Sequence, residues 1–166
     1  VAFLVCQSPP ARSAAKLRWK KLLCLLAFAG ALLGILGAYG AGLLDGFGKS
    51  PYDLSLRGIA VNIFYLGFTV TGMELSRAWF LNTFFHKRPF LGVALLSLLY
   101  SLFWFPLNRI TGLENALGMV KFLGSILLPA LAENVMSSYL AFWGGAAPAI
   151  VYRGALLLAR WFFPVL

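Results

Sequence analysis

Residues 22–44 form a run of 23 residues that contains no charged side chain. A transmembrane α-helix needs about 20 mainly apolar residues to cross a hydrocarbon core of ~30 Å. The run therefore predicts a membrane-spanning helix. The composition agrees, because 61% of the chain is hydrophobic and 11% is charged, whereas soluble domains carry about 25% charged residues.

Three further apolar segments predict spans at residues 59–81, 90–107 and 117–142. Pro129 predicts a kink in the fourth span, and Gly144, Gly145 and Pro148 predict a break after it. Residues 149–166 then form an amphipathic helix or a fifth span. We expect an all-α, polytopic transmembrane helical bundle with four spans plus this C-terminal helix. Its parts are a basic cytoplasmic segment (1–21), a four-helix transmembrane domain (22–143) and a C-terminal helix (144–166).

Basic residues outnumber acidic ones, 14 to 5, which gives a net charge of +9. They stand in short clusters beside apolar runs, a pattern that favours topology signals and contacts with anionic headgroups over nucleic-acid binding. Five precede the first span, and Lys87 and Arg88 follow the second. Because cytoplasmic segments are enriched in Lys and Arg, we expect a multi-pass protein of the plasma membrane with its N-terminus in the cytoplasm.

Four glycines recur at helical spacing along the first span: Gly30, Gly34, Gly37 and Gly40. Small residues on one face let a second helix approach closely. We therefore expect this stripe to be a helix-packing face, although glycine is also common in membrane helices without such a role. The expected partners are membrane lipid and other transmembrane subunits or further copies of the chain.

The apolar spans also contain a group of polar residues: Glu74, Arg77, Glu133, Asn134 and Arg153. With the N-terminus inside, all five fall in one layer, in the cytoplasmic leaflet. Charges at such depth are costly unless they are paired or hydrated. Two interpretations remain open, a structural ion-pair network and a polar functional site. In both, we expect Arg77 or Arg153 to neutralise Glu133.

Neither a metal site nor a catalytic site is indicated by the sequence. His86 is the only histidine, and the two cysteines, Cys6 and Cys24, lack the spacing of metal ligands. Ser137 and Ser138 are four helical turns from Lys121, so they cannot form a serine–lysine dyad. We expect no cofactor, no metal and no catalytic residue in this chain.

Several short sequences in residues 72–166 are similar to one known class of membrane domain. They are GMELSRA (72–78), PALAEN (129–134), SYLA (138–141), GG (144–145), PA (148–149), YRG (152–154) and WFFPVL (161–166). The chain thereby resembles the polytopic N-terminal part of signal-peptidase-I-like proteins of thermophilic Gram-positive bacteria. The catalytic serine and lysine of those proteins have no counterpart here. The resemblance implies that any protease activity lies beyond Leu166, and that Glu74, Arg77, Glu133 and Arg153 belong to the membrane domain's own core or site.

Two functions follow as expectations. The first is a non-catalytic membrane domain or small subunit that packs against partner helices and anchors a signal-peptidase-like module or a larger complex. The alternative is a fragment of a membrane enzyme or transporter with a Glu/Arg site in the cytoplasmic leaflet. A pigment-binding subunit is a third class, against which the single histidine argues.

Overall fold

The computed structural model describes residues 17–45, 55–103, 119–120 and 122–162, and every regular element in these ranges is helical. The helices are α2 (Leu17–Asp45), α3 (Leu56–Phe84), α4 (Pro89–Phe103), the π-helical turn η2 (Leu123–Leu127), α6 (Leu128–Gly144) and α7 (Ala146–Phe162). The prediction of an all-α fold is therefore confirmed for the described part of the chain. The predicted segment 1–21 ends inside a helix, because α2 already begins at Leu17 and includes Lys20 and Lys21.

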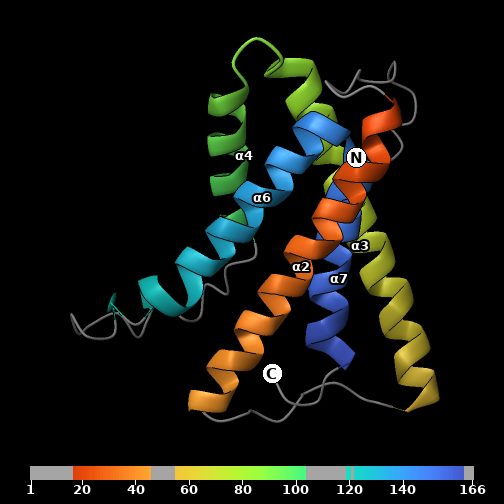
Figure 1. Cartoon of the computed structure of the whole chain (residues 1–166), viewed down its shortest axis with the longest axis vertical. Helices are drawn as coiled ribbons and strands as arrows, with labels where there is room; N and C mark the ends of the chain where they lie inside the picture. The colour runs from red at the N-terminus through yellow and green to blue at the C-terminus, as the bar shows by residue number, and fades with distance from the viewer. Residues whose placement is uncertain (1–16, 46–54, 104–118, 121, 163–166) are drawn as a thin grey trace.

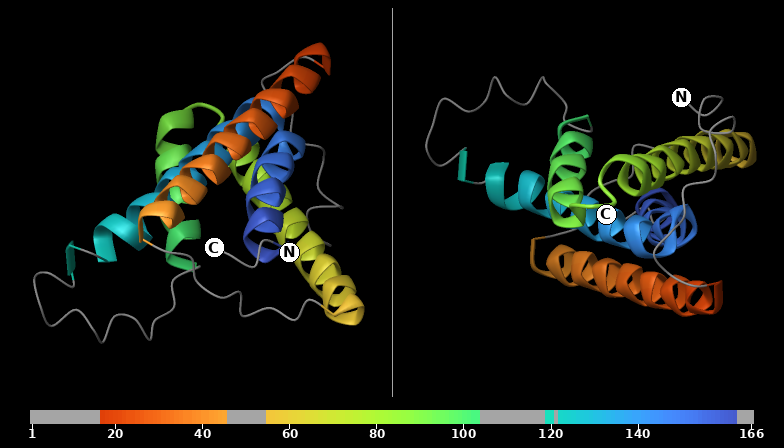
Figure 2. Two further views of the ribbon diagram at one scale, coloured as in Figure 1. Left: turned by 60° about the horizontal axis from the view of Figure 1, so that its bottom comes forward. Right: turned by 90° about the horizontal axis from the view of Figure 1, so that it is seen from above.

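Successive helices run in alternating directions, and they form three layers (Figures 1 and 2). α6 and α7 form the middle layer, with α2 packed on one side and α3 and α4 on the other. α7 contacts α2, α3 and α6, so the C-terminal helix is an integral part of the bundle.

Three helical segments are long and apolar enough to cross a membrane: Trp19–Leu43, Leu56–Phe84 and Leu123–Gly144. α4 is also apolar but has only 15 residues in the described part, and the end of the predicted third span (104–107) lies outside it. The first two helices extend beyond the predicted spans at both ends. Membrane-crossing helices are thus present by length and composition.

A π-helical turn lies just before Pro129, the position of the predicted kink. Proline has no backbone N–H, so it cannot continue the regular ladder of hydrogen bonds. Over Leu123–Leu127 the ladder shifts to the wider π spacing, and the N–H of Leu128 donates to the carbonyl of Leu123. Such single π turns are a known cause of helix bending.

The corner between α6 and α7 depends on two glycines. Gly145 has φ 76°, a left-handed conformation that favours glycine. At Gly144, a Cβ would lie 2.4 Å from Cγ of Pro148, so the close return of the chain excludes a side chain. The break predicted at Gly144, Gly145 and Pro148 is present between α6 and α7. Pro148 has no backbone N–H to bond to the carbonyl of Gly144, so a continuous helix would lose that hydrogen bond. Pro148 lies in the first turn of α7, where a missing N–H is tolerated.

Much of the apolar surface of the bundle is not covered by the protein itself. Within the candidate spans, only a tenth to a third of the residues are buried. On α2, Leu33 is 71% exposed and Leu36 is 65% exposed. A surface of this kind requires lipid or other helices around it.

Candidate functional site

Four of the five polar residues expected to lie together form a buried cluster between α3, α6 and α7. Glu74 and Arg77 are 0% exposed, Asn134 is 1% exposed and Arg153 is 7% exposed. Asn134 lies ten residues before the end of α6 and Arg153 lies seven residues after the start of α7. At 1.5 Å per residue the cluster is about 10–15 Å along these helices from the α6–α7 corner.

Arg77 is the centre of this cluster and uses both terminal nitrogens. One donates to the carbonyl oxygen of Asn134 at 2.9 Å and to Oγ of Ser138 at 3.3 Å. The other donates to Oδ1 of Asn134 at 2.7 Å. The Cζ atom of Arg77 lies over the ring of Tyr100, 4.4 Å from the ring centroid, which is a cation–π contact. These contacts join α3 to α6 and to α4.

Glu74 is the only acidic side chain of this cluster, and its contact with Arg77 is unusual. Oε2 of Glu74 lies 3.3 Å from Nε of Arg77, one helical turn along the same face of α3. Within the described residues, neither carboxylate oxygen has a hydrogen bond, and neither does Nε of Arg77. The pair is therefore a close contact of opposite charges without the alignment of a hydrogen bond.

Asn134 connects the two arginines. Its Oδ1 accepts from Arg77 at 2.7 Å and from Arg153 at 2.9 Å. Its Nδ2 donates to Oγ of Ser101 at 3.0 Å and to the carbonyl of Ala130 at 3.0 Å. Both ends of the amide are thus used, which fixes the side chain in one orientation.

Hydroxyl groups complete the cluster, and their part in it was not predicted from the sequence. Ser97 donates to Ser138 at 3.0 Å, Ser101 donates to the carbonyl of Ser97 at 2.7 Å, and the Ser76 and Tyr100 hydroxyls are 2.6 Å apart. The α4 residues at positions 97, 100 and 101 share one helix face by their spacing. This polar stripe in an otherwise apolar span is the feature from which the sequence could have predicted that α4 contributes to the cluster.

Glu133 does not pair with Arg77 or Arg153, and that expectation is corrected. Its Oε1 contacts Nη2 of Arg160, at the far end of α7. Neighbouring residues on a helix point about 100° apart. Because Asn134 faces α3 and α4, Glu133 faces the cavity that it shares with Gly34 of α2 and Arg160 of α7. The fifth predicted residue therefore belongs to a second, partly exposed ion pair.

Only half of the glycine stripe on α2 packs against another helix. A Cβ on Gly30 would lie 3.7–3.8 Å from Met136 and Tyr152, and a Cβ on Gly34 would lie 3.2 Å from Leu156. At Gly37 and Gly40 a Cβ would meet no atom of the described residues within 4 Å. The stripe thus faces α6 and α7 at its N-terminal half and open space at its C-terminal half.

The contacts of the cluster suit positioning rather than covalent chemistry. Ser138 Oγ is contacted by two donors, Arg77 and Ser97, and neither is a base that could activate it. Among the described residues, no group of His, Cys, Asp and Glu is arranged to hold a metal ion. His86 is exposed in the turn between α3 and α4.

Comparison of the chain with protein-family models, with curated proteins and with solved structures found no match.

Proposed function

We propose that this chain is a non-catalytic integral membrane domain whose polar cluster fixes the arrangement of its helices. The outer apolar faces pack against lipid and partner transmembrane helices. The observation that carries the proposal is the burial of the cluster, in which Glu74 and Arg77 have no exposed surface. A substrate or transported ion needs a path to the groups that bind it, and a closed cluster offers none.

The hydrogen bonding of the cluster supports the same function. Arg77, Asn134 and Arg153 come from three helices and are linked by direct contacts. In lipid, apolar contact alone does not select one helix arrangement, so interhelical hydrogen bonds and close packing do. A network with directional contacts to each helix specifies their rotation and register.

The exposed face of α2 supports the partner role. Its leucines are more than half exposed over much of the helix length, and Gly37 and Gly40 leave that side open. Small residues beside such a surface allow close approach of another helix. A further transmembrane subunit or a second copy of the chain is the occupant that this proposal assigns.

For the topology, we propose four spans with α7 as a fifth, in the plasma membrane, with the N-terminus cytoplasmic. The start of α2 and the α3–α4 turn lie at one end of the bundle (Figure 1). That end carries Lys20, Lys21, Lys87 and Arg88. The positive-inside rule assigns this basic end to the cytoplasm, where it also contacts anionic headgroups.

A peptidase-like module that follows the membrane domain is part of the same proposal. Its support is the similarity of the sequences within residues 72–166 to signal-peptidase-I-like membrane domains. The domain would then position the module at the membrane surface without taking part in its chemistry.

Photo-crosslinking tests the partner role. A benzophenone amino acid is placed at Leu33 or Leu36 of α2 and, separately, at Leu98 of α4, and the cells are irradiated. We expect a protein adduct of one defined mass from at least one face in the native membrane. The purified chain alone in lipid gives that adduct only if the partner is a second copy. Lipid adducts alone from every face would contradict the proposal.

One observation favours the alternative, a membrane enzyme or transporter fragment with a Glu/Arg site. The carboxylate of Glu74 is buried without a hydrogen bond in the described residues, as expected of a group that awaits a proton or a ligand. Under this alternative the cluster opens to water during function. Thiol labelling of a cysteine placed inside the cluster separates the two functions.

A further inference from the structure

A small cavity with a volume of about 60 Å³ lies between α2, α6 and α7. Gly34 and Ala38 line it from α2, Glu133 lines it from α6, and Tyr152 and Arg160 line it from α7. Its two charged residues are the partly exposed ion pair that lies outside the buried cluster. The cavity therefore places a carboxylate and a guanidinium beside the small residues of α2.

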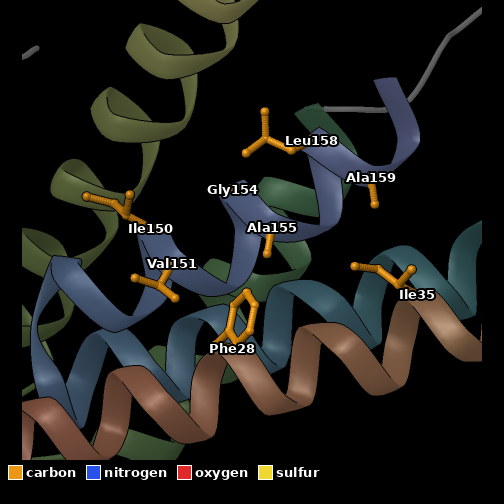
Figure 3. Close-up of a pocket in the computed structure, with 8 residues that line it drawn as sticks. All are labelled: Phe28, Ile35, Ile150, Val151, Gly154, Ala155, Leu158 and Ala159. Atoms are coloured by element: carbon orange, nitrogen blue, oxygen red, sulfur yellow. The ribbon is translucent and has the colours of Figure 1, made fainter. Parts of the chain in front are cut away.

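The polar lining distinguishes this cavity from the surface next to it. Ile35 and Ala159 border the cavity, and they also border a shallow depression between α2 and α7 whose lining side chains are all apolar (Figure 3). Apolar cavities stay dry, whereas water occupies sites that offer it about two to four polar partners. Of the two hollows, the cavity beside Glu133 is the one whose side chains offer such partners.

The ion pair leaves hydrogen-bonding capacity in this cavity. Oε1 of Glu133 contacts Nη2 of Arg160. Within the described residues, neither group makes a further hydrogen bond. A carboxylate can accept about four hydrogen bonds and a guanidinium can donate about five. Oε2 of Glu133 and the other guanidinium N–H groups can therefore bond to water.

The volume of the cavity is suited to water. One water molecule takes up about 30 Å³ in the liquid, so the cavity has room for about two. Typical small-molecule sites have volumes of ~300–1,000 Å³, which is far larger. The size of the cavity and the chemistry of its lining thus indicate the same ligand.

The depth of the ion pair in the bundle adds a reason for hydration. At 1.5 Å per residue, Ala38 lies about 10 Å from one end of α2 and about 30 Å from the other. The cavity is therefore within the proposed span 22–44, where charges are costly unless they are paired or hydrated. Arg160 is half-exposed, so its contact with Glu133 does not shield it fully.

The cavity lies nearer to the end of the bundle opposite the basic residues. α7 ends at Phe162, two residues beyond Arg160. Towards the same end, α2, α3 and η2 diverge from one another (Figure 1). Water therefore has its shorter path to the ion pair from that end.

We infer that the cavity between α2, α6 and α7 binds about two water molecules, which Glu133 and Arg160 hold within the membrane. The inference rests on the proposed membrane location, and it is independent of any protein partner. It assigns opposite environments to the two ion pairs of the bundle. The carboxylate of Glu133 is hydrated, whereas that of Glu74 is dry.

Water-edited solid-state NMR of the full chain in lipid bilayers tests this inference. The chain contains three glutamates, Glu74, Glu114 and Glu133. In the variant Glu114→Gln, ¹³C labelling of the glutamate carboxyl groups leaves two signals, and a further Glu133→Gln substitution assigns them by removing one. We expect magnetisation to pass from water to the Glu133 carboxyl about fivefold faster than to that of Glu74, because water is bonded directly to Glu133.

The outcomes separate this inference from the proposed function. Equally slow transfer to Glu133 and to Glu74 would overturn the inference and leave the closed cluster intact. Fast transfer to both would support hydration of Glu133, but it would contradict the proposed closed cluster around Glu74.

A substitution that fills the cavity locates the water. Ala38→Leu adds an isopropyl group to the lining. Gly40→Leu is the control on the same helix, because a Cβ there meets no atom of the described residues within 4 Å. We expect transfer to Glu133 to slow about fivefold in Ala38→Leu and to stay unchanged in Gly40→Leu. Unchanged transfer in a folded Ala38→Leu variant would overturn the assignment of the water to this cavity. If that variant does not fold, the comparison of Glu133 with Glu74 still decides the inference.

Discussion

The contacts among α3, α4, α6 and α7 differ in kind from the contact between α2 and α7. The first group is joined through Arg77 and Asn134, whose polar atoms reach across helices at 2.7–2.9 Å. At the contact between α2 and α7, Ala27 and Ala31 are completely buried. A Cβ added at Gly34 would lie 3.2 Å from a side-chain atom of Leu156. Hydrogen bonds and charge pairing stabilise the first interface, and close packing of small residues stabilises the second.

This difference reflects the solvent in which the bundle folds. Lipid tails are as apolar as leucine, so burial of apolar surface gives little drive for helix association. Hydrogen bonds and close backbone approach remain as the sources of specificity. Removal of a polar side-chain group should therefore destabilise the polar interface. Addition of a larger side chain should destabilise the small-residue interface.

The largest effect should come from Arg77→Leu. The substitution leaves the carboxylate of Glu74 buried without its cation, which typically costs about 3–5 kcal/mol. Unfolding titrations in mixed detergent micelles measure the change. The double variant Glu74→Gln/Arg77→Leu removes the orphaned charge and should recover part of the loss. Equal stability of the wild type and Arg77→Leu would show that the ion pair does not hold the bundle.

Asn134→Leu should rank second. The amide accepts from two arginines, and hydrogen bonds to charged groups contribute about 1.5–3 kcal/mol each. Leucine keeps the volume but not the acceptor, so unfolding free energy should fall by about 2–3 kcal/mol. Val135→Leu, one residue along on an exposed part of α6, is the control and should change little. Equal unfolding free energies for Asn134→Leu and Val135→Leu would show that the hydrogen bonds from Arg77 and Arg153 to Asn134 do not stabilise the bundle.

Gly34→Leu tests the contact between α2 and α7 by adding a side chain to it. A side chain there meets Leu156 and forces α2 away from α7, which typically costs about 1–3 kcal/mol. Gly40→Leu is the matched control, because it makes the same substitution in the same helix at a position where a Cβ meets no atom of the described part of the chain within 4 Å. It should leave the unfolding free energy of the isolated chain unchanged or raised. An equal loss in the two variants would contradict the packing of α2 on α7.

The smallest effect should come from Glu133→Gln. Its pair with Arg160 is partly exposed, and such pairs contribute at most about 1 kcal/mol. The same unfolding titration should place this variant close to the wild type. A loss as large as that of Arg77→Leu would mean that Glu133, and not Glu74, is the essential carboxylate.

The sequence was sufficient to predict an all-helical chain and three of its four spans as helices long and apolar enough to cross a membrane, because length and hydropathy alone define these. It also indicated the α6–α7 corner, since two adjacent glycines interrupt an apolar run. It was not sufficient to pair the charges. Glu133 and Asn134 are neighbours in the sequence, yet their side chains point about 100° apart on α6. Only the rotation of the helix decides which one meets Arg77.

The role of α4 was also beyond the sequence analysis. Ser97, Tyr100 and Ser101 are common residues in membrane helices, and their polar atoms can bond within their own helix. That they bond across to α6 and α3 depends on where α4 packs. Their shared helix face was the only sign of it.

Thiol labelling inside the cluster tests the central claim, that the cluster is closed to water. Ser138→Cys, in a background with Cys6 and Cys24 replaced by serine, is treated in intact membranes with a small charged methanethiosulfonate reagent. His86→Cys, in the exposed turn, is the positive control. A closed structural cluster predicts rapid labelling at position 86, and labelling at position 138 only after denaturation. Rapid labelling of Ser138→Cys in the native membrane would contradict it and favour an open Glu/Arg site.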